Sequence, residues 1–412
     1  MTLQITCGID WSEKHHDVAL VDEAGALIAK RRITETVEGS QELLTMLAEA
    51  GDCAEDPIPV AIETPRGLLV AELRATGRKI YPINPLAVAR YRERYSPSGK
   101  KSDHADAMVL ANILRTDAHI HRLLPDDTEL VRSIAVLARA SQDATWRRTR
   151  AANELRSLLR EYYPAMLEAA SIRSANLTSP VTRALLELAP TPAAAVKLTK
   201  PQIAAALRRV GRIRDVDRLA AELKDVLRRP QLRQDSQVEQ AMGIQALRLV
   251  ATLNAECDSV NLLADATAEA FQLHPDHEVI TSFPGLGEQT GARLLAEVGD
   301  DRVRFTDARA LKAFAGSAPV TRASGRSETI TFRRIKNDRL ASVGFSWAFS
   351  TLIASPGARA HYDRRRNKGD RHTAALRHLF NRLLGCLYHC VQHGLIYDEA
   401  TAFPTLPTTV AA

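Results

Sequence analysis

Four acidic residues in the amino-terminal third of the chain have the types and spacing of a metal site. Asp10 and Glu63 each close a short apolar run. Asp103 and Asp106 are three positions apart at the head of a helical pattern, so their side chains share one face. Carboxylates gathered in one place repel one another unless a divalent cation lies between them. We therefore expect all four to bind Mg2+, with Mn2+ as the alternative, because hard oxygen ligands select hard cations.

Such a site is suited to phosphodiester chemistry. In two-metal sites the ions lie about 3.5–4 Å apart and stabilise both the attacking and the leaving oxygen. Asp103 and Asp106 have a simpler explanation when taken alone, because Ser102 is a candidate N-cap and a helix dipole favours acids in the first turn. Their assignment to a metal site depends on their occurring together with Asp10 and Glu63.

A serine in a basic segment is the second candidate for chemistry. Ser324 and Gly325 lie between Arg322 and Arg326, and further basic residues follow. A serine hydroxyl is a weak nucleophile unless a base takes its proton or its alkoxide is stabilised, and a metal site with arginines could do both. A plain turn would also explain Ser-Gly, and Ser327 is a rival in the same segment.

Length and charge are those of a globular protein that could bind nucleic acid. The 412 residues predict two or three domains. The net charge of +6 is modest, but basic residues cluster at 132–160, 322–339 and 364–371, which favours contact with phosphates. No apolar run approaches the roughly 20 residues of a membrane span. The amino terminus does not resemble a signal peptide, so we expect a cytoplasmic protein without membrane association.

The five cysteines are scattered, which argues against a disulfide framework. Cys386 and Cys390, with His389 between them, could form a soft-metal site. Core-facing thiols on a buried helix are the simpler interpretation, because no second ligand pair lies nearby in the sequence.

The elements expected to position the acids alternate in the order of a mixed sheet. Apolar or alternating runs predict strands at 4–9, 17–21, 29–34, 59–63 and 79–83, and helical patterns predict helices at 40–50, 67–75 and after Pro85. This β-β-β-α-β-α-β-α order is the ribonuclease-H-like plan, in which the first and fourth strands lie side by side. Asp10 and Glu63 would then be neighbours.

The remainder is predicted to be helical, so the fold class is α/β followed by all-α. The runs 129–160 and 236–272 are long enough for a helical hairpin or coiled coil, which would serve self-association or reach along a nucleic acid. Further patterns predict a helix at 309–314, a loop at 315–320, a strand at 329–332 and a closing helix at 373–393.

The segment 280–299 has Pro-Gly-x-Gly between two helical runs, a helix-hairpin-helix signature. In this signature Gly285 and Gly287 let backbone N–H groups approach a phosphate. A plain turn between helices could use the same glycines.

These motifs resemble one known family, the insertion sequence 110 transposases, which include the Piv-like invertases and the bridge-RNA-guided recombinases. Gly-Ile-Asp-Trp (8–11), Ile-Glu-Thr-Pro (62–65), Ile-Asn-Pro (83–85) and Lys-Ser-Asp-His-Ala-Asp (101–106) resemble its RuvC-like DEDD domain. Phe-Pro-Gly-Leu-Gly (283–287), Phe-Ala-Gly (314–316), Ala-Ser-Gly (323–325) and Ile-Lys-Asn-Asp-Arg-Leu (335–340) resemble its second half. The family usually has a glycine shortly after this lysine, where the present chain has Asn337-Asp338.

The resemblance implies roles for these residues. The four acids would be the family's metal-binding tetrad, and Ser324 would be a nucleophile that forms a covalent phosphoserine link to DNA. A structured guide (bridge) RNA would specify donor and target DNA. Homodimers would assemble into a homotetramer in which the acidic domain and the serine of different protomers meet.

The expected domains are a RuvC-like DEDD domain (1–124), a helical dimerisation and RNA-binding region (125–275), a transposase domain with the serine (276–400) and a tail (401–412). Residues expected to contact nucleic acid are Gly285, Gly287, Gly325, Arg326, Arg333, Arg334, Lys336, Arg339, Arg147 and Arg148.

The leading interpretation is an RNA-guided DNA recombinase or transposase of an insertion sequence. One alternative is a hydrolytic RuvC-like endonuclease that acts on branched DNA, with the serine segment only contacting phosphate. The other is a non-catalytic nucleic-acid-binding assembly factor whose acids hold a structural ion.

Overall fold

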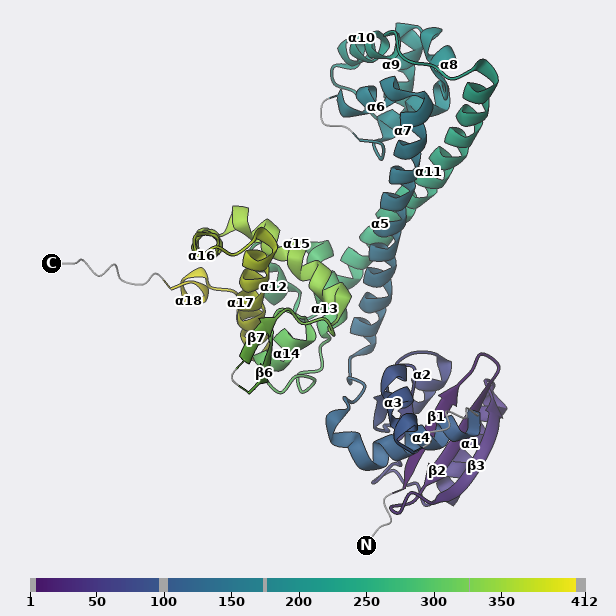
Figure 1. Cartoon of the computed structure of the whole chain (residues 1–412), viewed down its shortest axis with the longest axis vertical. Coiled ribbons are helices and arrows are strands. Elements are labelled where there is room, and N and C mark those ends of the chain that lie inside the picture. The colour runs from purple at the N-terminus through teal and green to yellow at the C-terminus, as the bar shows by residue number, and fades with distance from the viewer. Residues whose placement is uncertain (1–4, 96–102, 173–175, 326, 405–412) are drawn as a thin grey trace, which may run out of the picture. The chain divides into compact units, whose positions relative to one another are not determined.

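The computed structural model describes residues 5–95, 103–172, 176–325 and 327–404, which form two compact units, Met1–Asp126 and Asp127–Ala412. Figure 1 shows the elements of both units. The predicted division into domains at 124, 275 and 400 stays a prediction. Among the described residues, no helix combines the length and the apolar character that crossing a membrane requires.

The first unit contains a five-stranded mixed sheet with the strand order β3-β2-β1-β4-β5. Strand β1 is antiparallel to β2 and parallel to β4, so the predicted pairing of the first and fourth strands is confirmed. The strands are β1 (Thr6–Trp11), β2 (His15–Val21), β3 (Leu27–Thr34), β4 (Val60–Ile62) and β5 (Ile80–Pro82). The helices of this unit are α1 (Val37–Glu49), α2 (Leu68–Ala75), α3 (Pro85–Tyr95), α4 (Asp103–Asp117) and the 3-10 turn η1 (Ala118–Ile120).

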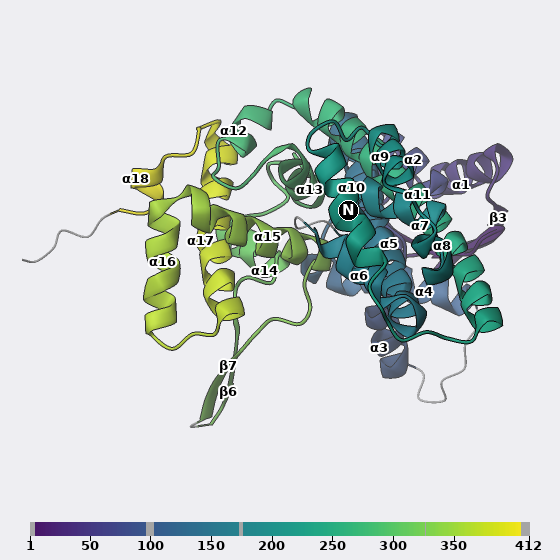
Figure 2. The same cartoon turned by 90° about the horizontal axis from the view of Figure 1, so that it is seen from above.

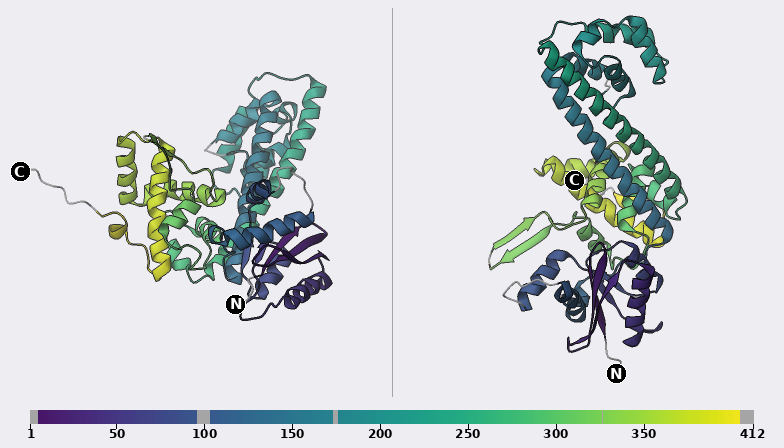
Figure 3. Two further views of the ribbon diagram at one scale, coloured as in Figure 1. Left: turned by 60° about the horizontal axis from the view of Figure 1, so that its bottom comes forward. Right: turned by 90° about the vertical axis from the view of Figure 1, so that its right-hand side faces the viewer.

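Helices cover both faces of this sheet, as the right-hand view of Figure 3 shows. Side chains alternate along a strand, so Cys7 and Ile9 point to one face and Gly8 points to the other. On the Cys7 face the core is completed by α1 and α2. On the Gly8 face Ala61 packs with apolar residues of α3 and α4.

The second unit is mostly helical. Its elements are α5 (Glu129–Tyr162), α6 (Pro164–Ser171), α7 (Pro180–Leu188), α8 (Pro192–Val196), α9 (Lys200–Arg209), α10 (Val216–Leu227), α11 (Ser236–Gln272), α12 (His277–Thr281), α13 (Glu288–Val298), α14 (Ala308–Phe314), β6 (Val320–Ser324), β7 (Ser327–Thr331), α15 (Asp338–Ala354), α16 (Pro356–Asn367), α17 (His372–His393) and α18 (Glu399–Ala402).

Two long helices, α5 and α11, run side by side, and α6–α10 pack at one end of the pair (Figure 1). A second core joins the start of α5 to α13, α15 and α17. Its largest fully buried side chain is Trp347, whose indole N–H donates to the Pro284 carbonyl at 3.0 Å.

Two expected boundaries were wrong, and one strand was not predicted. Strand β1 continues to Trp11, so Asp10 lies inside the strand and not after it. Helix α1 begins at Val37 and not at 40, because the Thr36 hydroxyl caps it by accepting from the Gly39 amide at 3.2 Å. Strand β6 was missed altogether, since the segment is polar and pairs only with β7.

Candidate functional site

Asp10 and Glu63 lie at the same level of two neighbouring strands. In the parallel register of β1 and β4, Ile9 pairs with Ile62. Asp10 is the next residue of β1 and Glu63 is the first residue after β4, so the two backbone positions are neighbours at the carboxyl edge of the sheet. Open sheets with parallel strands commonly bind ligands at this edge.

Alternation of side chains places Asp10, two positions after Gly8 on β1, on the side of the sheet that α4 covers. Glu63 follows the end of β4 directly. A Cβ on Gly8 would lie 2.0 Å from the Ala107 carbonyl oxygen, so only glycine permits this approach of β1 to α4. The Thr6 hydroxyl, on the same face of β1, donates to the Ala111 carbonyl at 3.0 Å.

The other two acids are carried by α4 itself. Asp103 is the first residue of the helix, one turn before Ala107, but its side chain and the Ser102 cap lie outside the described residues. Asp106 is 3% exposed, and its Oδ1 lies 2.5 Å from the Arg92 guanidinium of α3. A buried carboxylate needs such a partner or a cation.

The donor set fits a hard divalent cation, because every predicted ligand offers carboxylate oxygens. Among the described side chains no three acids, histidines or cysteines already form a metal-binding cluster. That search includes Asp10, Glu63 and Asp106 but not the side chain of Asp103. The structure thus brings Asp10 and Glu63 together, and metal binding by the four acids stays a prediction.

Asp17 is a residue that the sequence analysis missed. It pairs in register with Asp10 across the antiparallel strands β1 and β2, so both side chains lie on the same face. Asp17 is 2% exposed, and Arg32 on β3 donates to it twice, at 2.7 and 3.1 Å. The bidentate contact therefore holds the Asp17 carboxylate, together with the positive charge of Arg32, on the strand next to Asp10. The signal was available in the register of the predicted hairpin, which sets Asp17 opposite Asp10.

Ser324 and Ser327 face each other across the tip of a β-hairpin. They form the last pair of β6 and β7, and Gly325 in the turn has φ +59°. Arg326 lies outside the described residues. Both serines are exposed, and no described side chain hydrogen-bonds to either hydroxyl. The hairpin stands off from the helices of its own unit (Figure 2 and Figure 3).

The predicted helix-hairpin-helix segment joins α12 to α13. Gly285 has φ +81°, and a Cβ there would lie 2.8 Å from the Thr351 amide nitrogen of α15. The structure therefore explains Gly285 by packing against α15. Gly287 precedes α13 and a Cβ would meet nothing within 4 Å, so its backbone is the more accessible of the two.

Several basic residues predicted to contact nucleic acid already have partners within the chain. Arg339 donates to Asp143 at 2.8 Å, and its guanidinium lies 5.2 Å from the Trp146 ring centroid. Lys336 pairs with Asp338 at 2.6 Å. Their first effect is to stabilise this unit, and nucleic-acid contact stays a prediction.

The remaining candidates differ in exposure. Arg147 pairs with Glu256 at 2.8 Å although half of its side chain is exposed. Arg334 is exposed and lies over Phe332, and the Arg333 Nε is buried with no hydrogen-bond partner among the described residues. Arg148 is partly buried on α5.

Comparisons with known proteins agree with this arrangement. A family model for the DEDD domain of IS110, described as "Transposase", matches residues 7–164, and the model "Transposase IS116/IS110/IS902 family" matches residues 277–363. The "Mini-circle putative transposase for IS117" of Streptomyces coelicolor is 56% identical over 405 residues, which are 98% of each chain. The "Insertion element IS110 uncharacterized 43.6 kDa protein" of the same organism is 31% identical over 332 residues, 79% of each chain.

The acid-bearing sheet, the hairpin serine and these matches define an enzyme of DNA transposition and recombination. The chain belongs to the IS110 family of transposases.

Proposed function

We propose that this transposase is an RNA-guided DNA recombinase that cleaves and rejoins strands through a DEDD metal site and a phosphoserine intermediate. The observation that supports the proposal is the parallel register of β1 and β4, in which Ile9 pairs with Ile62 and the residues that follow them are Asp10 and Glu63. The strand order supports a ribonuclease-H-like, RuvC-like domain. DNA, as donor and target, is the substrate.

In this proposal Asp10, Glu63, Asp103 and Asp106 hold Mg2+, which when bound polarises the scissile phosphate and lowers the cost of charge on the attacking oxygen. Asp17 and Arg32 hold the neighbouring strand so that Asp10 keeps its orientation. Arg92 balances the charge of Asp106 when no cation is present.

Ser324 is the proposed nucleophile. Its Oγ forms a bond to phosphorus while the bond from phosphorus to the leaving sugar oxygen breaks, and the hydroxyl proton passes to that oxygen. One phosphodiester is thus exchanged for another, and reversal of the step rejoins a strand without an external energy source. Because no described side chain of its unit hydrogen-bonds to either serine hydroxyl, we propose that a metal site of another protomer, in a homotetramer built from homodimers, activates the serine.

RNA guidance follows from the family resemblance and has its own test. The long α5–α11 pair and the basic residues on it are the proposed site of RNA binding and dimerisation. Sequencing the RNA that co-purifies with the protein should yield one discrete species with loops complementary to the flanking DNA. Heterogeneous RNA, or none, would contradict guidance.

The nucleophile is tested by trapping the covalent adduct. Wild-type protein incubated with labelled substrate DNA should give an adduct that survives denaturation, Ser324→Ala should give none, and Ser327→Ala should retain it. Mapping of the adduct to Ser327 would reassign the nucleophile. Cleavage by Ser324→Ala with a water-derived hydroxyl on the product would favour the hydrolytic endonuclease.

A further inference from the structure

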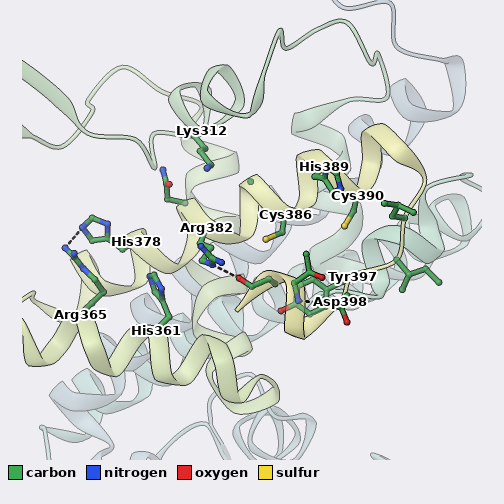
Figure 4. A pocket seen from close by; sticks show the side chains of 16 residues that line it. Lys312, His361, Arg365, His378, Arg382, Cys386, His389, Cys390, Tyr397 and Asp398 are labelled. Atoms are coloured by element: carbon green, nitrogen blue, oxygen red, sulfur yellow. Dashed lines mark hydrogen bonds between the residues drawn. The ribbon is translucent and has the colours of Figure 1, made fainter. Parts of the chain in front are cut away.

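A cavity of about 590 Å³ lies in the second unit, between α14, α16, α17 and the segment 395–402 (Figure 4). Its volume falls within the roughly 300–1,000 Å³ that is typical of sites for small organic ligands. It contains neither of the two candidate serines and none of the acids discussed above.

One wall of this cavity carries positive charge that the chain does not neutralise. Lys312 of α14 and Arg382 of α17 both line it. Among the described residues neither has a carboxylate partner, and the Arg382 guanidinium donates only to the Ala402 carbonyl, at 2.6 Å. Arg365 also lines the wall, but Asp370 pairs with it at 2.5 Å.

The carboxylates of Asp398 and Glu399 accept hydrogen bonds from groups other than Lys312 and Arg382. Asp398 lines the cavity, but it caps α18 by accepting from the Thr401 amide at 2.6 Å. Glu399 accepts from Ser355, Gly357 and Tyr397. The excess charge on Lys312 and Arg382 is therefore open to an external anion.

The pKa of His361, which also lines the cavity, is lowered by nearby positive charges. Burial, together with the cationic side chains of Arg364, Arg382 and Arg365 and the ring of His378, lowers the His361 pKa to about 4. Its Nε2 is buried with no hydrogen-bond partner among the described residues. A neutral imidazole at this place offers a polar atom to a ligand without adding charge.

The opposite part of the lining is apolar. Leu395, Ile396 and Tyr397 form one side, and Leu395 and Ile396 are 49% and 65% exposed. Burial raises the pKa of both Cys386 and Cys390, so these thiols are protonated and behave as small apolar groups. Among the described residues, Cys386, His389 and Cys390 do not form a group that could hold a metal ion.

We propose that this cavity binds a nucleotide, with the phosphate at Lys312 and Arg382 and the base against Tyr397 and the thiol side of α17. A phosphate alone would fill only a small part of the space and leave the apolar side uncovered. A purely apolar ligand would leave the positive charges of Lys312 and Arg382 without a counter-charge. A nucleotide satisfies both sides, and an enzyme that acts on DNA meets nucleotides as unpaired or terminal units of a strand.

Binding is measured with the full-length protein by isothermal titration, using deoxyadenosine 5′-monophosphate, deoxyadenosine and inorganic phosphate as separate ligands. The monophosphate should bind saturably and at least tenfold more tightly than either of the others. Equal affinity for inorganic phosphate, or no saturable binding of the monophosphate, would overturn the proposal.

Two variants locate the ligand in the cavity. Gly385→Leu places a side chain in the space while favouring the helix, because the nearest contact of a new Cβ is the flexible end of Lys312 at 2.8 Å. Lys312→Ala removes the unpaired charge. Each should weaken monophosphate binding at least tenfold, whereas Lys368→Ala, exposed at the end of α16 and outside the cavity lining, should change it less than twofold. Unchanged binding in both cavity variants would contradict the proposal.

A competition experiment identifies the source of the nucleotide. Displacement of the monophosphate by a 5′-phosphorylated single-stranded oligonucleotide supports a strand end as the occupant, and failure to displace it supports a free nucleotide. The cleavage-deficient Asp10→Asn protein should bind the monophosphate as wild type does. The two proposals can therefore fail separately. A wrong cleavage mechanism would not rule out nucleotide binding in the cavity, and a lack of nucleotide binding would not rule out the cleavage mechanism.

Discussion

At the scale of single residues, one register pair adds a carboxylate that no motif indicated. Asp17 lies opposite Asp10 and is held by two hydrogen bonds from Arg32. Replacement of a residue that orients a metal ligand often lowers metal affinity or activity 10–100-fold. Asp17 is therefore expected to act through the position of Asp10.

We predict that Asp17→Asn lowers both Mn2+ affinity and the rate of DNA cleavage roughly tenfold, because the amide cannot hold the Arg32 guanidinium as the carboxylate does. Arg32→Ala should have a similar effect, and Lys30→Ala, exposed on the same strand, should have none. Metal titration and single-turnover cleavage check this. Unaltered metal affinity in Asp17→Asn would show that the pair only stabilises the sheet.

At the scale of elements, the approach of α4 to β1 decides where the acids of the helix lie. The contact depends on the missing Cβ of Gly8 and on the Thr6 hydroxyl. A shift of α4 would move Asp103 and Asp106 away from the carboxyl edge of the sheet.

We predict that Gly8→Ala destabilises the protein by about 1–3 kcal/mol, the usual cost of overpacking, and reduces cleavage by more than the loss of folded protein explains. Chemical denaturation and cleavage assays on the same preparation measure the two effects. Gly77→Ala is a poor control because its φ is +72°, so Ala71→Ser, exposed on α2, is preferred. Full activity of folded Gly8→Ala protein would contradict this role of α4.

A second link between elements makes stability depend on pH. Asp52 follows α1 and Arg78 precedes β5, and their side chains are 2.7 Å apart. Burial by itself raises the pKa of Asp52, but hydrogen bonds from Arg78 and from the Ile58 amide outweigh it and hold the pKa below its ordinary value. The stabilisation is present above the unfolded-state pKa of about 4 and is lost as the pH falls through the lower folded-state pKa.

We predict that wild type loses roughly 0.5–1 kcal/mol more free energy of unfolding than Asp52→Asn between pH 7 and pH 3, because at pH 3, about one unit below the unfolded-state pKa, a single carboxyl can lose at most about 1.4 kcal/mol. Urea unfolding at both pH values gives the difference. Parallel losses in the two proteins would show that this carboxylate does not carry the pH dependence.

The sequence predicted the order of elements in the first unit and the pairing of its first and fourth strands, because apolar runs mark buried strands and the order of elements limits how they pair. It did not predict the role of Asp17, which depends on cross-strand register, or strand β6, whose residues are polar and exposed. The packing of Gly285 against Thr351, distant in sequence, could not be read locally either, and phosphate contact by Gly285 stays a prediction. The cavity beside α17 arises from segments far apart in the chain, so no motif marks it.

At the scale of the whole molecule, the acids lie in one unit and the serine in the other. Among the described residues no side chain hydrogen-bonds to the hairpin serines, so in the proposed chemistry an acid site outside the hairpin activates the serine. A homotetramer in which different protomers supply the two parts meets this requirement.

We predict that Asp10→Asn and Ser324→Ala proteins, each inactive alone, recover strand transfer when mixed, because mixed assemblies contain some sites with both intact parts. Activity should rise to a sizeable fraction of wild type at a 1:1 ratio, measured by product formation on labelled DNA. A mixture with no activity, in which gel filtration shows that the two proteins do co-assemble, would place acids and serine of one protomer in the same site.

The account rests on joint binding of divalent ions by Asp10, Glu63 and the acids of α4. Titration of the protein with Mn2+, followed by electron paramagnetic resonance, tests this most directly. Wild type should bind Mn2+ saturably, and Asp10→Asn and Glu63→Gln should each weaken that binding at least tenfold while DNA binding stays within about threefold. If both variants bind Mn2+ as tightly as wild type, the two carboxylates are not metal ligands and the proposed mechanism is wrong.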